Sequence, residues 1–291
     1  MNSIALSAGT IDYEDTGGTG PVLVLLHGLL MDSSLWDGVI AGLADGCRCI
    51  APTLPLGAHR RPMRADAELS LRAVAGLVAE FLERLELRNV TLAGNDTGGA
   101  LAQLVVAAGR TDRVARIVLV SCDAFDNFPP GATGRALVAT GRLPPVLFGL
   151  FMQQMRLRAV RRLPLAFGWL TRRGDAATAR WIRPLLEDAR VRRDLVATLR
   201  TAAADAGALR AAAEALGRFE GPALVVWASE DRVMPPAHGR RLAGLFPDGR
   251  LVEVADSYTL IPLDQPAVLA RVIGEFLRSD ATATTGARLH A

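Results

Sequence analysis

The strongest chemical signal in the chain is the segment Gly94-Asn95-Asp96-Thr97-Gly98-Gly99. It follows an apolar run at 90–93, typical of a buried strand, and opens a stretch at 98–108 with the pattern of a helix. Its small residues allow a very sharp strand-to-helix turn that holds the Asp96 side chain out at the tip. A helix N-terminus favours an anion, so we expect Asp96 to be ionised and hard to protonate. An aspartate that only caps the helix would give the same local pattern.

A second motif, His27-Gly28-Leu29-Leu30, directly follows an apolar strand expected at 22–26. In this order the two motifs resemble the α/β-hydrolase family, in particular its haloalkane dehalogenase and epoxide hydrolase branch, and the resemblance covers about residues 1–280. It implies that Asp96 occupies the nucleophile position, where the usual residue is serine. It also implies that Leu29 and Thr97 supply backbone N–H groups to an oxyanion or leaving-group pocket, and that His27 is structural.

The same resemblance assigns the acid of a catalytic triad. Asp231, in the segment 227–235 after an expected strand, stands at the family's position for the acid, and Glu230 is its weaker alternative. Some dehalogenases take the acid from the end of the sixth strand, where this chain has Asp123 and Asp126. These two aspartates would equally serve as turn residues or helix caps.

Thr259 stands where the resemblance expects the catalytic histidine, within the segment 256–266. In the aspartate branch, Asp attacks carbon and carries an alkyl ester, and the histidine activates the water that hydrolyses it. A threonine hydroxyl does not take up a proton near neutral pH. Three possibilities stay open: another recruited base, Asp96 acting as a base without covalent chemistry, or a pocket that only binds a ligand. His59, in a loop expected at the same sheet edge, is the candidate for a recruited catalytic base, although a surface loop histidine would look the same.

The pocket is expected between Asp96 and a helical insertion, with largely apolar walls. Its candidate lining residues are Leu29, Leu30, Trp36, Asp123, Phe125, Asp126, Phe128, Phe148, Phe151, Met152, Tyr258 and Thr259. Dehalogenases of the family hold the halide with a Trp or Asn at places that here carry Thr97 and Leu29. The insertion also has no tyrosine of the kind that protonates an epoxide. Tyr258 is therefore the candidate phenol donor, or else a packing residue.

A regular alternation of strands and helices would position these residues. Short apolar runs alternate with amphipathic stretches up to residue 126 and again from 219, which is typical of a parallel sheet with helices on both faces. We predict an α/β fold with a doubly wound, mostly parallel, eight-stranded sheet. Its core comprises 1–126 and 219–280, with a helical cap at 127–218 and a disordered tail at 281–291. Such an insertion would lie over the carboxyl ends of the strands, where ligands bind.

The composition argues against several classes of function. The formal net charge is +3, lysine is absent and the arginines are scattered, so Schiff-base chemistry, Walker-type phosphate binding and a nucleic-acid partner are not expected. We expect no secretory leader, no membrane span and no membrane partner. The three cysteines match neither a disulfide framework nor a zinc spacing, which favours a cytoplasmic location. No metal or organic cofactor is implied.

These observations favour a hydrolase-family enzyme that acts on a small, largely apolar organic substrate through Asp96. The expected reaction is hydrolytic displacement at carbon, as in dehalogenases and epoxide hydrolases. The alternatives are an Asp96-dependent proton-transfer enzyme, such as a lyase, isomerase or cyclase, and a non-catalytic binder of small molecules. A simple serine esterase is not expected, because no Gly-x-Ser-x-Gly segment occurs. The sequence does not indicate an oligomeric state.

Overall fold

An eight-stranded sheet forms the centre of the molecule in the computed structural model, which describes residues 1–287. Its strands are β1 (Asn2–Leu6), β2 (Gly9–Asp15), β3 (Val22–Leu26), β4 (Arg48–Pro52), β5 (Val90–Asp96), β6 (Val114–Cys122), β7 (Ala223–Ala228) and β8 (Gly249–Val254). They lie in the order β1-β2-β4-β3-β5-β6-β7-β8. β1 and β2 form an antiparallel hairpin, β2 is antiparallel to β4, and the other neighbouring pairs are parallel. The predicted fold class is confirmed.

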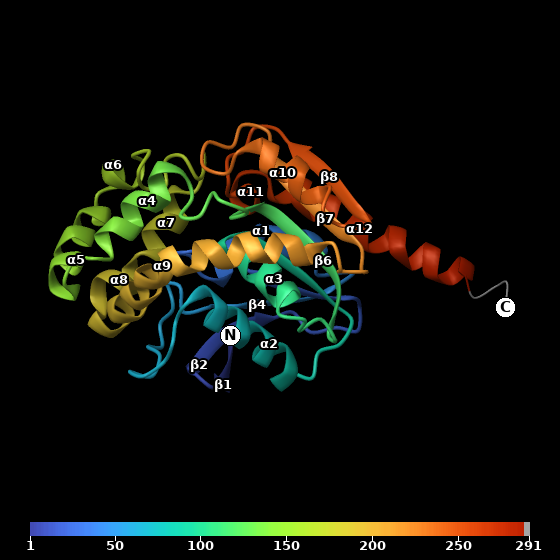
Figure 1. The fold of residues 1–291 in the computed structure, drawn as a ribbon, viewed down its shortest axis with the longest axis horizontal. Coiled ribbons are helices and arrows are strands. Elements are labelled where there is room, and N and C mark those ends of the chain that lie inside the picture. The colour runs from blue at the N-terminus through green and yellow to red at the C-terminus, as the bar shows by residue number, and fades with distance from the viewer. Residues whose placement is uncertain (288–291) are drawn as a thin grey trace.

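Helices cover both faces of the sheet (Figure 1). On one face, α1 (Asp37–Leu43) packs against α12 (Pro266–Ala287). On the other, α2 (Leu71–Arg84), α3 (Thr97–Ala107) and α9 (Ala189–Leu216) pack against one another. The central strands are therefore enclosed, and β5 is buried at every position. Burial on both sides explains why these strands are continuous apolar runs rather than alternating ones.

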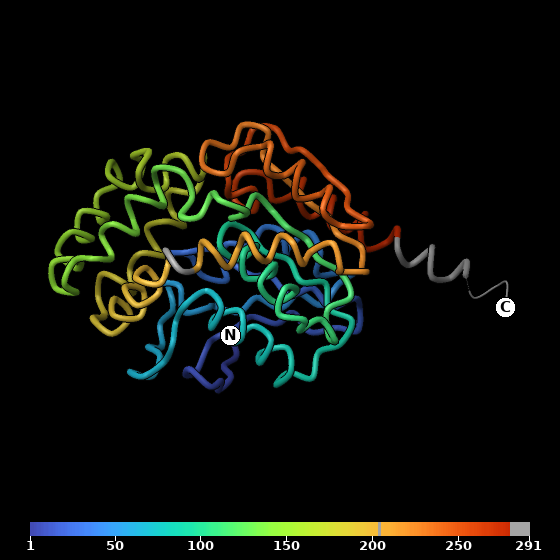
Figure 2. The backbone as a smooth tube through the Cα atoms, viewed as in Figure 1, coloured from blue at the N-terminus to red at the C-terminus, as the bar shows by residue number. Residues whose placement is uncertain are grey.

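The segment between β6 and β7 contains no strand and forms a helical cap. Its helices are α4 (Gly131–Thr140), α5 (Pro145–Met152), η2 (Gln153–Arg156), α6 (Arg158–Arg161), α7 (Asp175–Trp181), α8 (Arg183–Glu187) and α9. The tube in Figure 2 leaves the sheet after β6, passes through the cap and returns along α9 to β7. α9 packs on α4, α5 and α8 within the cap and also on α2 and α3 of the core. The predicted boundary at 218 therefore follows a helix that both parts share.

The remaining helices belong to the core. They are η1 (Ser33–Trp36), α10 (Pro236–Ala243) and α11 (Ile261–Asp264). α12 extends into the predicted tail and reaches Ala287, and residues 288–291 of that tail lie outside the described residues. None of the helices described here combines the length and the apolar character needed to cross a lipid bilayer.

Candidate active site

The turn between β5 and α3 has the sharp geometry that its glycines allow. Asp96 has φ +56° and ψ −129°, a backbone conformation that is unfavourable for a residue with a side chain. A Cβ added to Gly94 would lie 2.2 Å from the Gly98 carbonyl oxygen, and a Cβ added to Gly98 would lie 2.2 Å from the Leu26 carbonyl oxygen. Only glycine fits at these two places, so the chain turns tightly and projects Asp96 from the carboxyl end of the sheet.

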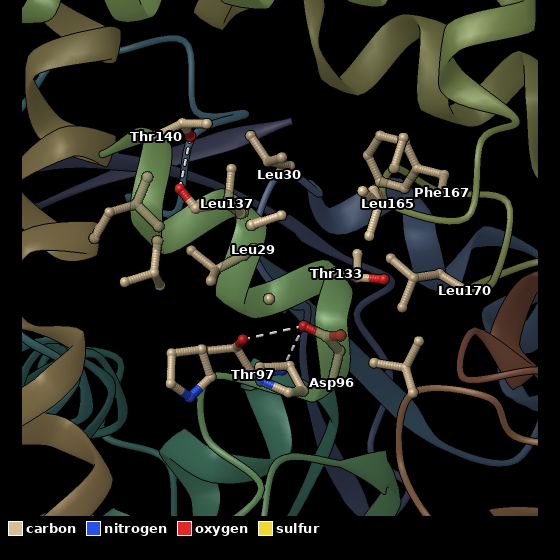
Figure 3. A pocket seen from close by; sticks show the side chains of 18 of the residues that line it. Leu29, Leu30, Asp96, Thr97, Thr133, Leu137, Thr140, Leu165, Phe167 and Leu170 are labelled. Carbon is tan, nitrogen blue, oxygen red and sulfur yellow. Dashed lines mark hydrogen bonds between the residues drawn. The ribbon is translucent and has the colours of Figure 1, made fainter. Parts of the chain in front are cut away.

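Backbone N–H groups and a hydroxyl hold the Asp96 carboxylate. Its Oδ1 accepts hydrogen bonds from Thr97 N at 2.7 Å and from Thr97 Oγ1 at 3.0 Å (Figure 3). Burial nevertheless raises the pKa of Asp96 above its ordinary value, against the lowering effect of the Thr97 hydrogen bonds and of the Leu29 N–H. The expectation that Asp96 is hard to protonate is therefore wrong, because desolvation outweighs the helix N-terminus. Both N–H groups expected to face a substrate oxygen act on Asp96 itself.

The His27-Gly28 pair brings the end of β3 against the Asp96 side chain. A Cβ added to Gly28 would lie 2.2 Å from Asp96 Oδ1, so any side chain here would displace the carboxylate. His27 is fully buried, its Nδ1 donates to the Gly28 carbonyl oxygen at 2.8 Å, and its Nε2 accepts from Leu54 N at 2.8 Å. Burial lowers the pKa of His27 to about 4, so the ring is neutral at neutral pH and has no nitrogen left for catalysis.

Asp123, directly after β6, is linked to Asp96 through Thr97. The Thr97 hydroxyl oxygen lies 3.0 Å from Asp96 Oδ1 and 3.0 Å from Asp123 Oδ2. One hydroxyl donates one proton, so two ionised carboxylates would leave one of these contacts without a proton. Burial, and then the charge of Asp96, raise the pKa of Asp123 well above its ordinary value. We therefore assign a proton to Asp123, which donates to Thr97 while Thr97 donates to Asp96.

Asp231 and Thr259 are paired as the acid and the base of a triad would be, but without an imidazole. Asp231 Oδ1 accepts hydrogen bonds from Thr259 Oγ1 at 2.8 Å, Val233 N at 2.9 Å and Met234 N at 2.8 Å. Burial raises the pKa of Asp231 to about 6 in spite of the hydrogen bonds to its carboxylate. The structure thus gives the buried Asp231 carboxylate a hydroxyl, and no imidazole, as its side-chain partner among these groups.

Asn95 fixes the surroundings of these groups, and the sequence analysis did not single it out. Its Nδ2 donates to the Val120 carbonyl oxygen at 2.9 Å and to the Thr259 carbonyl oxygen at 2.8 Å. The amide thereby ties the ends of β5 and β6 to the loop that carries Thr259. The sequence does contain a signal for this role, which is an amide in an otherwise apolar strand. A buried amide requires hydrogen-bond partners.

An apolar cavity of about 310 Å³ lies between Asp96 and the cap (Figure 3). Asp96 and Thr97 are on its wall at the core side. Its apolar wall includes Leu29, Leu30, Phe128, Leu137, Phe151, Met152, Leu163, Leu165, Phe167 and Leu170. The volume and the apolar walls suit a small organic molecule. The cap residues of this wall beyond Phe128, Phe151 and Met152 were not predicted, because nothing in the sequence distinguishes them from other apolar cap residues.

Several side chains predicted for the pocket do not line it. Trp36 and Phe148 are fully buried in the hydrophobic core, whereas Asp126 is exposed. The Phe125 ring packs under the Arg241 guanidinium, whose Cζ lies 3.9 Å from the ring centroid. Asp123 and Thr259 are also absent from the wall. Asp123 is buried behind Thr97, to which it is hydrogen-bonded, and Thr259 is buried against Asp231.

Tyr258 packs between arginines instead of facing the cavity. The Cζ atoms of Arg172 and Arg232 lie 4.5 and 4.6 Å from its ring centroid, which are cation–π contacts. The Tyr258 backbone N–H donates to Asp264 Oδ2 at 3.1 Å, and Asp264 Oδ1 accepts from Thr171 Oγ1 at 2.7 Å. Asp264 therefore joins the loop before α11 to the segment of the cap between α6 and α7.

His59 does not line the cavity, contrary to the expectation that it replaces the catalytic base. Its Nδ1 accepts from Gly57 N at 3.3 Å, so Nε2 carries the proton and donates to Asp194 Oδ2 at 3.1 Å. The loop does reach the carboxyl edge of the sheet, but a buried carboxylate of α9 engages the ring. His59 thus attaches the core to the cap. His238, which lies on α10, packs against the Phe125 ring. No histidine among the described residues lines the cavity.

Comparisons with known proteins agree with this architecture. Residues 21–266 match the family model described as the alpha/beta hydrolase fold. The chain is 31% identical over 292 residues to Haloalkane dehalogenase 2 of Mycobacterium tuberculosis, covering 92% of each protein. A haloalkane dehalogenase structure from Bradyrhizobium elkani matches with a TM-score of 0.78 at 20% identity, over 97% of this chain and 98% of that one.

An enol-lactonase structure from Burkholderia xenovorans matches with a TM-score of 0.72 at 19% identity, over 95% of this chain and 100% of that one. At such identities the solved structures show the fold alone. The family match and the mycobacterial relative go further, because they cover most of the sequence. The chain therefore belongs to the α/β-hydrolase fold family.

Proposed function

We propose that the protein is an enzyme that moves a proton on a small, largely apolar organic molecule, with Asp96 as the general base. The carrying observation is that Asp96 faces an apolar cavity, with the Thr97–Asp123 pair behind it and no histidine of the described residues on the cavity wall. Two carboxyl groups whose surroundings separate their proton affinities are a recurring arrangement in acid–base catalysis. Proton transfer needs this arrangement alone, whereas hydrolysis of an ester on Asp96 needs a base that Thr259 does not supply.

Asp96 would take a proton from a carbon next to a carbonyl group. The electron pair of the broken C–H bond moves toward the carbonyl oxygen, and Asp96 returns the proton to another atom of the same molecule or to the intermediate after a bond has broken or closed. The raised pKa makes Asp96 a stronger base than an exposed aspartate. Isomerase, lyase and cyclase reactions all share this step.

Displacement at carbon, with an ester formed on Asp96, is the second candidate. It is favoured by the name of the mycobacterial relative, a haloalkane dehalogenase, and by the position of Asp96 at the tip of the turn, on the cavity wall. The Leu29 and Thr97 side chains offer no indole or amide to a departing halide. The reaction would also stop at the ester, because Thr259 cannot activate water.

Deuterium exchange and intact mass together test the proposal. The protein is incubated in D₂O with a panel of small apolar ketones, haloalkanes, epoxides and activated esters. We expect exchange of a ketone C–H for C–D, seen by NMR, that is lost in Asp96→Asn, with no covalent adduct in the intact mass after a parallel incubation in H₂O. A mass gain located on Asp96 would support displacement at carbon instead. Ligand binding of equal affinity in the wild type and Asp96→Asn, without exchange or adduct, would support a binder.

A further inference from the structure

The outer side of the cap exposes large apolar side chains. In the described part of the chain, every large apolar side chain recorded as exposed, other than Met1, belongs to the cap. These residues, called the cap patch below, are Val146, Leu147, Leu150, Phe151, Leu157, Leu163 and Leu165. Soluble surfaces ordinarily carry such residues singly, so a cluster within one segment indicates a surface that something covers.

Helix α5 is apolar on both of its sides. Phe148 and Met152 are buried within the cap, whereas Val146 is 76% and Leu150 is 65% exposed. A surface helix that packs on one side normally presents polar residues on the other. Figure 1 shows α5 at the outer edge of the cap, far from the sheet. Its second apolar side is therefore directed away from the rest of the protein.

Arginines are frequent in the part of the sequence that contains the cap patch. The segment 131–174 contains eight arginines, at 135, 142, 156, 158, 161, 162, 172 and 173, and no acidic residue. Arg142 and Arg156, which flank α5 and η2, are exposed and form no ion pair with any described side chain. Arg158 and Arg162 both approach a single carboxylate, that of Asp175. Arg172 and Arg173 pair with Glu230 and Asp256, and Arg161 is buried. Arg135, Arg142 and Arg156 are thus the exposed arginines of this segment that have no acidic partner among the described side chains, and the arginines are concentrated here, contrary to the expectation of scattered charge.

The cap patch is continuous with the cavity. Phe151, Leu163 and Leu165 are 46%, 52% and 57% exposed, and the same three residues line the cavity that reaches Asp96. An apolar molecule on the cap patch would therefore meet an apolar route to Asp96.

We propose that the cap patch docks on an anionic phospholipid bilayer, with its apolar side chains at the acyl boundary and its arginines at the phosphate groups. An apolar surface with a basic border is the pattern of proteins that lie on a bilayer without crossing it. A second copy of the chain would bring the same positive charge to the interface and repel the first. The expectation of no membrane partner followed from the lack of a span, which interfacial docking does not need. The inference is independent of the role of Asp96.

Vesicle co-sedimentation of the full-length protein tests this docking. Vesicles of phosphatidylcholine alone are compared with vesicles containing half phosphatidylglycerol. We expect binding to the anionic vesicles, with little binding to the neutral ones. The double variant Leu147→Ser/Leu150→Ser, which changes exposed residues outside the cavity wall, should lose binding. Arg142→Gln/Arg156→Gln should bind anionic vesicles roughly 30-fold more weakly, because each arginine near an anionic surface contributes about a factor of five.

A matched control removes the same charge elsewhere. Arg88→Gln/Arg218→Gln changes two exposed arginines at the opposite end of the sheet and should bind as the wild type does. Thermal melting is the check that all three variants are folded. The proposal is overturned if the wild type does not sediment with anionic vesicles, or if the control loses binding as much as the Arg142/Arg156 variant. A dimer seen by light scattering that disappears in Leu147→Ser/Leu150→Ser would overturn it too, and would assign the cap patch to a second copy.

Discussion

The Thr259 hydroxyl donates a hydrogen bond to Asp231 Oδ1 across 2.8 Å, in the place where a triad histidine would meet its acid. The acid keeps its partners from the backbone, Val233 N and Met234 N, and remains buried. The loop that holds Asp231 is therefore fully formed, with a hydroxyl as the side-chain partner of the carboxylate. On the proposed assignment of Asp231 as a triad acid, this position carries no base for hydrolysis.

Replacing Thr259 with histidine should restore hydrolysis. The imidazole would lie beside Asp231 and activate water against an ester on Asp96, a contribution of about 10²–10⁴-fold. We expect turnover of an activated ester or haloalkane where the parent shows none or a single event, measured by product release over many equivalents of enzyme. Thr259→Val is the control, because it keeps the shape without a base. A folded Thr259→His variant with no turnover on any member of the panel would contradict this account.

Removing the Thr97 hydroxyl should shift the pH dependence of the proton-transfer rate. The hydroxyl lowers the pKa of Asp96, so Thr97→Val raises that pKa further and moves the acidic limb of the pH–rate profile to higher pH. Thr97→Ser keeps the hydroxyl and should keep the limb in place. The measurement is the exchange rate into D₂O across pH. An unshifted limb in Thr97→Val would show that the hydroxyl does not govern the base.

Replacing Asp123 with asparagine should leave the pH–rate profile in place. An amide resembles the protonated acid, since its Nδ2 can donate to Thr97 as the Asp123 carboxyl group does. If Asp123 were ionised instead, the substitution would remove a neighbouring negative charge and lower the pKa of Asp96. The acidic limb would then move to lower pH, and the assignment of the proton to Asp123 would have to be abandoned.

Asp231 should make folding stability fall as pH rises through the weakly acidic range. Its pKa is raised from 3.8 to about 6, so the folded state holds a proton that the unfolded state has released between these values. The stabilisation is complete below about pH 4 and is lost by about pH 6, an effect of up to about 3 kcal/mol. Urea unfolding at pH 4 and pH 7 should show that wild type loses this much stability relative to Asp231→Asn. An equal loss of stability in the wild type and in Asp231→Asn between these pH values would argue against burial of Asp231 as the cause.

His59→Ala should destabilise the protein without removing the base. The substitution takes a donor from the buried Asp194 carboxylate, which costs about 1–3 kcal/mol, and weakens the attachment of α9 to the core. We expect a lower melting temperature and an exchange rate per folded molecule close to that of the wild type. A stable but inactive His59→Ala variant would contradict this prediction and indicate that His59 takes part in the reaction.

The turn that carries Asp96 was predictable because its causes are local. A Cβ on Gly94 would meet the carbonyl oxygen of Gly98 in the same short segment, and the small residues that the turn requires are visible in the sequence itself. The proposal that Thr259 occupies the position of a catalytic histidine rests on the order of motifs along one loop, and it stays a prediction. The alternation of strands and helices gave the sheet, because burial on both faces leaves a continuous apolar pattern.

The partners of buried polar groups were not predictable, because they come from distant parts of the chain. His59 meets a carboxylate 135 residues away, and neither sequence neighbourhood indicates the other. The raised pKa of Asp96 has a similar origin, since desolvation depends on the cap that closes over the cavity. Trp36 and Phe125 were predicted for the cavity wall because they are apolar and follow site segments in the sequence. Apolar character alone does not distinguish a cavity wall from a hydrophobic core.

The Asp264 carboxylate accepts hydrogen bonds from Thr171 of the cap and from the backbone N–H of Tyr258, next to Thr259. It therefore joins two segments that are distant in the sequence. A second link runs beside it, because Leu260 N donates at 2.8 Å to the carbonyl oxygen of Leu170, a residue of the cavity wall. The part of the cap that forms the cavity wall and the loop that carries Thr259 are therefore tied by two hydrogen-bonded links. A ligand that displaced Leu170 would act directly on the backbone next to Thr259.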